Sequence, residues 1–135
     1  MSDFPAAAEL KVEVGEALTH NVIPLLHEIR HALQRMLDTG EQTAIDLRSL
    51  PLAPGEEERL FGMLGNGEVQ IRMSALGPSE IIETRFPGVW VVRHFNSDDE
   101  VVGTYIEICN VPGLVMAQPE DVRYGLEQLQ TELDQ

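Results

Sequence analysis

The sequence predicts an α+β fold, a two-layer sandwich in which a mainly antiparallel sheet of about five strands carries three helices on one face. Strand-like segments with two-residue alternation follow one another through short turns in residues 65–109, and strands joined this way pair antiparallel. Three other segments carry apolar residues at the three- to four-residue spacing of one-sided helices. One-sided helices and a sheet with one wet face imply two layers.

The first helix is expected over residues 19–38. Pro24 falls in its first turn, where proline is tolerated, and Gly40 follows its end. His27 and His31 lie between the apolar positions rather than among them. The apolar stripe consists of Val22, Leu25, Leu26, Ile29, Leu33, Met36 and Leu37.

A short strand over residues 43–47 and a second helix follow. Pro54 begins this helix, and Glu56, Glu57 and Glu58 occupy its first turn, where the helix dipole favours carboxylates. Gly65 ends it. A closing helix is expected over residues 119–133. The apolar sides are Leu60, Phe61, Met63 and Leu64 in the second helix, and Val122, Leu126, Leu129 and Leu133 in the closing one.

Four strands are predicted within residues 65–109. In the first, apolar and polar side chains alternate, so one face is buried and one is wet. In the third, valines stand on both sides of Trp90, which leaves open the sheet face that this side chain occupies. The alternating sets are Val69, Ile71 and Met73 in the first strand, Ile82, Thr84 and Phe86 in the second, and Val102, Thr104, Ile106 and Ile108 in the fourth, where Tyr105 and Glu107 face the other way.

Length and composition are those of one globular domain. The chain has 135 residues, of which 43% are hydrophobic and 24% are charged. Residues 1–17 have weak periodicity and are expected to form an N-terminal arm, with a single domain over residues 18–135. No apolar run approaches the length of a membrane span, and the first residues lack the pattern of a secretory signal. We therefore expect a cytoplasmic protein without membrane insertion.

The charge balance narrows the class of partner. The net charge is −14, with nine lysines and arginines and no basic cluster, which disfavours nucleic acid and anionic membrane surfaces. A basic peptide or basic protein surface would be attracted. Cys109 is the only cysteine, which excludes an internal disulfide and a self-contained four-thiolate cluster, so no cofactor is expected. Its position in a strand predicts a buried, unreactive thiol.

His27, Glu28 and His31 match the H-E-x-x-H pattern of zinc proteases. That chemistry needs both histidines on one helix face, the glutamate as general base and a third ligand. No third ligand is visible at a usual spacing, and at about 100° per residue the two histidines point away from the apolar stripe. The favoured interpretation is an exposed helix with two ordinary histidines. A zinc-dependent hydrolase at these three residues is the alternative.

The predicted sheet also carries rings, arginines and carboxylates, the residue types enriched where proteins contact partners. We expect partner binding, including self-association, through the sheet. The face away from the helices is the candidate if it is open, but the sequence leaves open which face binds. A small-molecule site between sheet and helices is a further alternative. The candidate partner-binding residues are Arg72, Arg85, Trp90, Tyr105 and Glu107.

Three stretches carry a resemblance to a known family: 64–69 (LGNGEV), 87–90 (PGVW) and 105–112 (YIEICNVP). In their combined order the chain resembles the HupH/HyaF family of hydrogenase expression and formation proteins, from about residue 25 to residue 133. The resemblance implies a non-enzymatic accessory protein of [NiFe]-hydrogenase assembly. It implies a chaperone that binds the iron–sulfur small-subunit precursor before export through the twin-arginine pathway, together with a thioredoxin-like accessory protein. Some relatives look about twice as long, with two such units, so a homodimer is also expected.

Overall fold

The structure, a computed structural model, describes residues 21–74 and 77–135. The predicted N-terminal arm, residues 1–17, lies outside the described residues. The elements are α3 (Val22–Thr39), β1 (Thr43–Asp46), the 3-10 turn η1 (Leu47–Ser49), α4 (Glu56–Leu64), β2 (Gln70–Met73), β3 (Ser79–Glu83), β4 (Val89–Phe95), β5 (Val101–Ile108), the 3-10 turn η2 (Gly113–Val115) and α5 (Pro119–Leu133).

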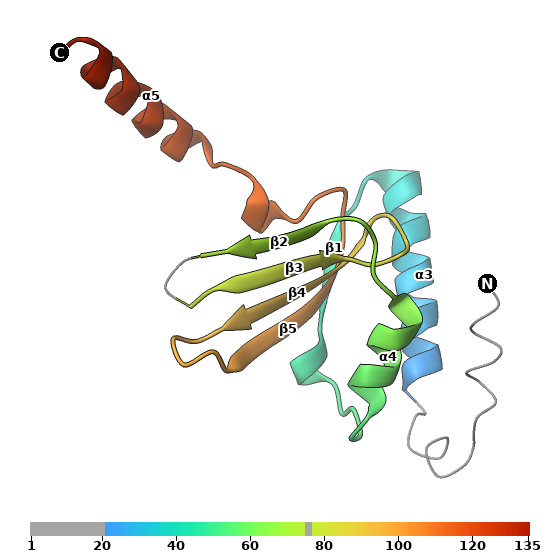
Figure 1. Cartoon of the computed structure of the whole chain (residues 1–135). Helices are drawn as coiled ribbons and strands as arrows, with labels where there is room; N and C mark the ends of the chain where they lie inside the picture. Colours follow the sequence, from blue (N-terminus) through green and yellow to red (C-terminus); the bar gives the residue numbers. More distant parts are fainter. Residues whose placement is uncertain (1–20, 75–76) are drawn as a thin grey trace.

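The five strands form one open antiparallel sheet in the order β1-β5-β4-β3-β2 (Figure 1). The strands β2 to β5 pair with their chain neighbours because short turns connect them. β1 joins the sheet from the other side, beside β5. The two edge strands, β1 and β2, have four residues each and are the shortest of the sheet. The α+β class and the antiparallel sheet predicted from the sequence are confirmed.

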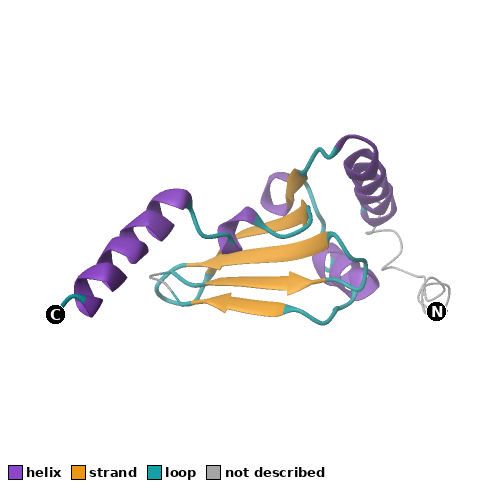
Figure 2. Cartoon of the chain, turned by 90° about the horizontal axis from the view of Figure 1, so that it is seen from above, coloured by secondary structure: helices purple, strands orange, loops and turns teal. Residues whose placement is uncertain are grey.

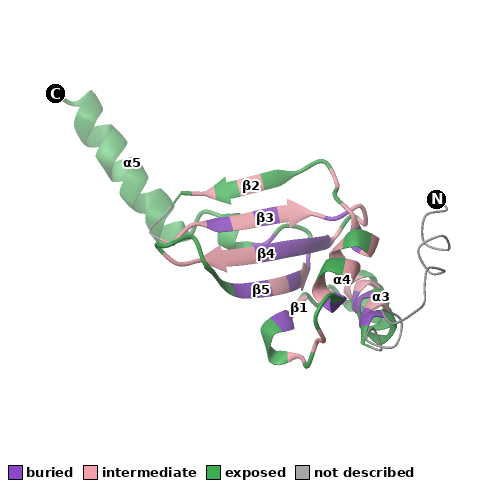
Figure 3. Cartoon of the chain, turned by 60° about the horizontal axis from the view of Figure 1, so that its bottom comes forward, coloured by how far each residue is buried: buried purple, intermediate pink, exposed green. Residues whose placement is uncertain are grey.

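Helices α3 and α4 pack on one sheet face and enclose the main core. Leu25 and Ile29 of α3 and Leu60 of α4 meet the sheet where β4 begins and β5 ends. Buried residues accordingly gather in β4, β5 and the adjoining helices, as Figure 3 shows. The buried members of this core are Leu25, Ile29, Ala32, Leu47, Leu60, Leu64, Val89, Val91, Ile106 and Ile108.

The opposite sheet face, called the back face from here on, is apolar as well. Ile81, Trp90, Val92 and Cys109 are buried there, and Ile71 packs against them. The expectation of one wet sheet face is therefore wrong. The indole Nε1 of Trp90 donates a hydrogen bond to the carbonyl oxygen of Cys109, 3.1 Å away, which ties the chain leaving β5 to this face.

The strand β3 lies earlier in the chain than its alternation suggested. It runs over Ser79–Glu83, so Thr84 and Phe86 belong to the turn before β4. The hydroxyl of Thr84 explains the shift, because it accepts from the backbone N–H of Phe86 and donates to the carbonyl oxygen of Val89. Gly88 completes the turn with φ at 94°.

The last of the three predicted helices, α5, does not cover the sheet. Figures 1 and 2 show α5 leaving the domain at the end of the sheet opposite α3 and α4. None of its residues is buried. The prediction of three helices on one face is therefore wrong for α5, whose apolar stripe faces solvent. An amphipathic pattern indicates that a helix has a side to bury, but it does not say against what.

The ends of α3 and α4 follow the predicted glycine signals. Gly40 ends α3 with φ at 82°, and Gly65 ends α4 with φ at 66°. The start of α3 is fixed differently, because Asn21 makes no side-chain cap bond. Instead its backbone N–H donates to Oε2 of Glu56, at 3.1 Å, and its side chain donates to the carbonyl oxygen of Pro51. The starts of the two helices are thereby joined.

Candidate partner-binding surface

The back face brings Trp90, Tyr105 and Glu107 together. Trp90 of β4 pairs with Glu107 of β5, and Val92 pairs with Tyr105, so these side chains project from the same side. The ring of Tyr105 meets that of His94 edge to face, with centroids 5.7 Å apart. Gly103 leaves room for this contact, since a Cβ there would lie 3.3 Å from Cε1 of Tyr105.

Trp90 is a structural residue of this face rather than an exposed anchor. Its side chain is 6% exposed, and its only polar atom binds the carbonyl oxygen of Cys109. Tyr105 and Glu107 are half-buried and therefore present part of their surface to solvent. Which face Trp90 occupies could not be read from β4, whose valines lie on both sides.

The pKa values of Glu107 and Cys109 are both raised, chiefly by burial. Burial raises the pKa of the Glu107 carboxyl, and the nearby His94 acts in the opposite direction. Burial raises the pKa of the Cys109 thiol to about 11, and the charge of Glu107 adds to this effect. The thiol is therefore protonated at neutral pH. The predicted buried thiol is confirmed.

His94 is held by a second polar contact that the sequence did not indicate. Its Nδ1 lies 2.8 Å from the hydroxyl oxygen of Ser79, on the neighbouring strand β3. The two residues are paired in the sheet register, so this hydrogen bond depends on the antiparallel alignment of β3 and β4. Spacing in the sequence alone could not reveal it.

The two arginines lie away from the back face. Arg72 is exposed, and its register with Glu80 and Arg93 puts it on the side of the helices. The Cζ atom of Arg93 lies 4.9 Å from the ring centroid of Phe61 in α4. Arg72 therefore does not share a surface with Tyr105 and Glu107.

Arg85 binds the end of α4. Its Nε and Nη2 donate to the carbonyl oxygen of Met63, at 3.3 and 3.1 Å, and its Cζ lies 4.7 Å from the ring centroid of Phe86. A guanidinium near a helix C-terminus satisfies carbonyls that have no intrahelical partner. Of the five candidate residues, the structure thus brings together Trp90, Tyr105 and Glu107, and separates Arg72 and Arg85 from them.

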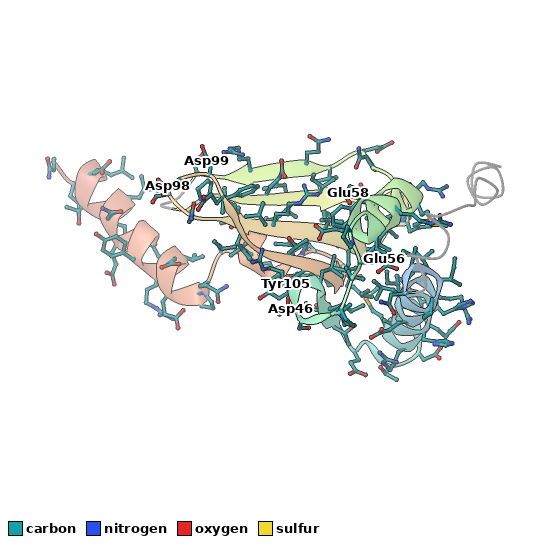
Figure 4. The ribbon with its side chains drawn as sticks, turned by 90° about the horizontal axis from the view of Figure 1, so that it is seen from below. Asp46, Glu56, Glu58, Asp98, Asp99 and Tyr105 are labelled. Atoms are coloured by element: carbon teal, nitrogen blue, oxygen red, sulfur yellow. The ribbon has the colours of Figure 1, made fainter. Side chains whose placement is uncertain are left out.

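Carboxylates surround the sheet without forming one cluster (Figure 4). Asp46 lies beside Tyr105, its partner in the register of β1 and β5, and accepts a hydrogen bond from the backbone N–H of Arg48. Asp98 and Asp99 occupy the exposed turn between β4 and β5, far from Glu58 on α4. In residues 21–74 and 77–135, no three potential ligands among histidine, cysteine, aspartate and glutamate are grouped to hold a metal ion.

The H-E-x-x-H histidines are exposed on α3, as the helical geometry predicted. Nη2 of Arg30 lies 3.2 Å from Nδ1 of His27 and 3.2 Å from Nε2 of His31. A metal ion bound by these two nitrogens would have a guanidinium charge between its ligands. This arrangement disfavours a zinc site at His27, Glu28 and His31.

Comparison with known proteins identifies the family. The model of the HupH hydrogenase expression protein, C-terminal conserved region, matches residues 19–135. This chain belongs to the HupH family.

Individual relatives agree with this assignment. The hydrogenase expression/formation protein HupH of Rhizobium leguminosarum bv. viciae is 31% identical over 103 residues, which cover 76% of this chain and 36% of that protein. HoxQ of Azotobacter vinelandii, also described as a hydrogenase expression/formation protein, is 32% identical over 111 residues, covering 81% of this chain and 39% of the relative. The chain thus spans less than two fifths of either relative.

A solved structure shares the fold. The hydrogenase expression protein HupH from Thiobacillus denitrificans ATCC 25259 superposes with a TM-score of 0.81 at 41% identity, covering 84% of this chain and 95% of that chain. The resemblance read from the three sequence stretches is confirmed.

A groove next to α3 is a feature of this HupH-family domain that the sequence analysis did not locate. It encloses about 280 Å³ between α3, the end of α4 and the turn before β4. Its walls are apolar apart from Arg30. The stripe of α3 could have indicated one wall, but the opposite wall comes from residues far away in the sequence. The lining residues are Leu26, Ile29, Arg30, Leu33, Leu64, Phe86 and Val89.

The described parts of this HupH-family chain contain no helix with the length and apolar character of a membrane span.

Proposed function

We propose that this chain is a non-enzymatic chaperone of [NiFe]-hydrogenase assembly, which binds the iron–sulfur small-subunit precursor in the cytoplasm before export. The observation that carries the proposal is its membership of the HupH family over residues 19–135. The relatives are described as hydrogenase expression/formation proteins, which is consistent with an accessory role. A thioredoxin-like accessory protein belongs to the same proposal as a further partner.

The charge of the chain supports binding to a basic segment of the precursor. The chain has 23 acidic residues against nine lysines and arginines. Exposed carboxylates stand around the sheet, among them Asp46 beside Tyr105 and the pair Asp98 and Asp99 (Figure 4). A precursor exported through the twin-arginine pathway carries adjacent arginines in its signal, and guanidinium–carboxylate pairs are strong, directional contacts.

The back face is the proposed contact surface. Tyr105 and Glu107 are half-buried there, with a ring and a carboxylate next to each other in the sheet. Tyrosine combines a large apolar ring with a polar end, and is enriched at the centres of interfaces. Trp90 stabilises this surface through its hydrogen bond to the carbonyl oxygen of Cys109, which fixes the chain after β5. Arg72 and Arg85 lie elsewhere and are proposed only for a more extended contact.

The non-enzymatic assignment is supported by the burial and protonation of the Cys109 thiol and by the contacts of His27 and His31. The thiol of Cys109 is buried and its pKa of about 11 keeps it protonated. His27 and His31 share the guanidinium of Arg30. These contacts favour binding over nucleophilic or metal-assisted chemistry.

Anaerobic co-purification with the small-subunit precursor tests the proposal. The precursor is used full-length and without its export signal, and the hydrogenase large subunit is the control. We expect capture of the small subunit alone, weakened at high salt if charge drives the contact. A Tyr105→Ala, Glu107→Gln double variant should bind more weakly than a Glu68→Gln variant, which changes an exposed carboxylate elsewhere. Failure to capture either form of the small subunit would refute the proposal.

The apolar groove beside α3 favours one second candidate, a small apolar ligand. Apolar clefts with a single charged group are typical of small-molecule sites. A ligand that binds only the folded chain raises the temperature of unfolding. Screening apolar metabolites against the chain and against a Leu33→Trp variant, which fills the groove, distinguishes specific stabilisation from general effects.

A further inference from the structure

The exposed apolar surface of the described chain is concentrated in its C-terminal part. Nine of the fourteen large hydrophobic side chains that are exposed in residues 21–74 and 77–135 lie within residues 111–133. Such a concentration marks an interaction surface, whereas scattered exposed hydrophobics need no explanation. The nine are Val111, Leu114, Val115, Met116, Val122, Tyr124, Leu126, Leu129 and Leu133.

Helix α5 carries most of this surface and lacks support from the domain. It has 15 residues and none of them is buried. An isolated helix of this length is only marginally stable in water, and helices in proteins are stabilised mainly by packing of their apolar face. A partner for this face would therefore also stabilise α5.

The spacing on α5 fits another helix. Val122, Leu126, Leu129 and Leu133 are separated by four, three and four residues, the alternation of four- and three-residue steps that is typical of a coiled-coil seam. A helix that covers a sheet normally has a wider apolar face, with a third apolar position in each heptad. These four residues, called the α5 seam from here on, are suited to one partner helix.

The charges beside the seam fit a second copy of the same helix. The positions that flank the seam are occupied by Arg123, Gly125, Gln130 and Glu132. The other carboxylates of α5, including Glu120, lie further round the helix at about 100° per residue. Two α5 helices can therefore approach without a row of like charges across the seam. A basic partner helix would find few carboxylates there.

We propose that two copies of this chain dimerise through antiparallel pairing of their α5 seams. The spacing of the seam is the same in both directions, so Val122 faces Leu133 and Leu126 faces Leu129 of the second copy. Antiparallel helix dipoles attract, and the two acidic domains are held at opposite ends of the pair. Each copy presents the same surface, as a twofold axis requires.

The segment before α5 enlarges this interface. Specific interfaces generally bury at least about 1,000 Å², which two helices of this length hardly reach alone. In the antiparallel pair, the C-terminal end of each α5 points toward the other copy's residues 111–116. Leu114 and Met116, 44% and 56% exposed, can cover that end.

The salt dependence of the affinity distinguishes this dimer interface from binding to a basic partner. Each copy has a net charge of −14, so two copies repel at low ionic strength, and salt screens the repulsion. Dimerisation through apolar seams should therefore strengthen with salt. We expect the dissociation constant to fall by about tenfold or more between about 20 mM and about 500 mM NaCl.

Sedimentation equilibrium of the whole chain tests the proposal. The double variant Leu126→Asp, Leu129→Asp should be monomeric at concentrations where the unmodified chain is dimeric. The matched variant Gln128→Asp, Thr131→Asp adds the same two charges on the opposite side of α5 and should remain dimeric. As monomers, both variants should unfold at the same temperature as the monomeric unmodified chain, because no residue of α5 is buried in a single chain.

Disulfide trapping tests the orientation. Mixing a Val122→Cys variant with a Leu133→Cys variant should give the mixed disulfide, since the native Cys109 is buried. A monomeric unmodified chain at high salt, equal behaviour of the two Asp variants, or preferential Val122→Cys self-linkage would overturn the proposal. Precursor capture is measured separately, so a chain that dimerises without binding a precursor refutes the chaperone function alone.

Discussion

Single residues at buried positions carry structural roles that their type does not suggest. Glu56 belongs to an acidic first turn, yet its side chain is 1% exposed. Its two carboxylate oxygens accept from the backbone N–H groups of Ala53, at 2.6 Å, and of Asn21. A carboxylate in this position satisfies backbone donors of two helix starts at once.

Removing the Glu56 carboxylate should destabilise the fold. Glu56→Ala leaves two backbone donors without an acceptor, which is expected to lower the free energy of unfolding by about 1–3 kcal/mol. Urea unfolding followed by circular dichroism measures the change. Glu58→Ala, an exposed position in the same helical turn, is the control and should differ little. Equal stability of the two variants would contradict this role.

Glu107 should make stability depend on pH. Its pKa is raised above 4.5 by burial, so the folded chain binds this proton more tightly than the unfolded chain. The stabilising contribution is present below pH 4.5 and is lost as the pH rises through the folded-state pKa. Glu107→Gln removes this loss and should unfold at a higher temperature than the unmodified chain at about pH 8.

The difference between the two proteins should shrink as the pH approaches 4.5. Glu68→Gln, which changes an exposed carboxylate, should show no comparable pH-dependent gain. Thermal unfolding of all three proteins over a pH series measures this. A gain for Glu107→Gln that is independent of pH would rule out ionisation as the cause.

At the scale of elements, the helices and strands could be predicted far better than their packing. The stripe of α3 and the glycines that end α3 and α4 indicated the right segments, because these signals act within one element. The α5 stripe gave the right helix but the wrong neighbour. The position of Trp90, the bond between Ser79 and His94, and the groove beside α3 depend on strand register and on contacts between distant segments.

A glycine-to-alanine substitution can be compared in two backbone contexts, at Gly88 in the turn before β4 and at Gly62 inside α4. Gly88 has φ at 94°, and an added Cβ would lie 3.3 Å from Leu33 Cδ2 and Met36 Cε. Gly88→Ala should therefore lower the free energy of unfolding by about 1–2 kcal/mol. Gly62→Ala, inside α4 with nothing within 4 Å of the added atom, should raise it by about 0.5–1 kcal/mol. Denaturant unfolding measures both, and equal signs would contradict the assigned backbone strain.

At the scale of the whole molecule, the negative charge acts on the folded state itself. With a net charge of −14 at pH 7, repulsion among carboxylates favours expansion of the chain. The family and the acidic character were accessible from the sequence, since both are properties of residue order and composition. The distribution of the carboxylates around the sheet was not, because it depends on the fold.

Salt should stabilise the domain near neutral pH. Screening reduces the repulsion, so the unfolding temperature should rise between about 20 mM and about 500 mM NaCl. The effect should disappear near pH 4.4, where the sequence has no net charge. The monomeric Leu126→Asp, Leu129→Asp variant separates this effect from dimerisation. A rise that is as large at pH 4.4 as at pH 7 would show that salt acts through hydrophobic burial instead.

The short outer strands of the sheet have a consequence for a protein proposed to hold incompletely folded chains. An outer strand presents unpaired backbone groups that can template the addition of another extended segment, and so begin aggregation. Here the outermost strands, β1 and β2, have four residues each. β1 pairs only with residues 105–108 of β5, so residues 101–104 also lie at the border, where Nη1 of Arg48 donates a hydrogen bond to the carbonyl oxygen of Val101. The domain can therefore contact an incompletely folded partner through its side chains, while few unpaired backbone groups are available for that partner to add a strand to the sheet.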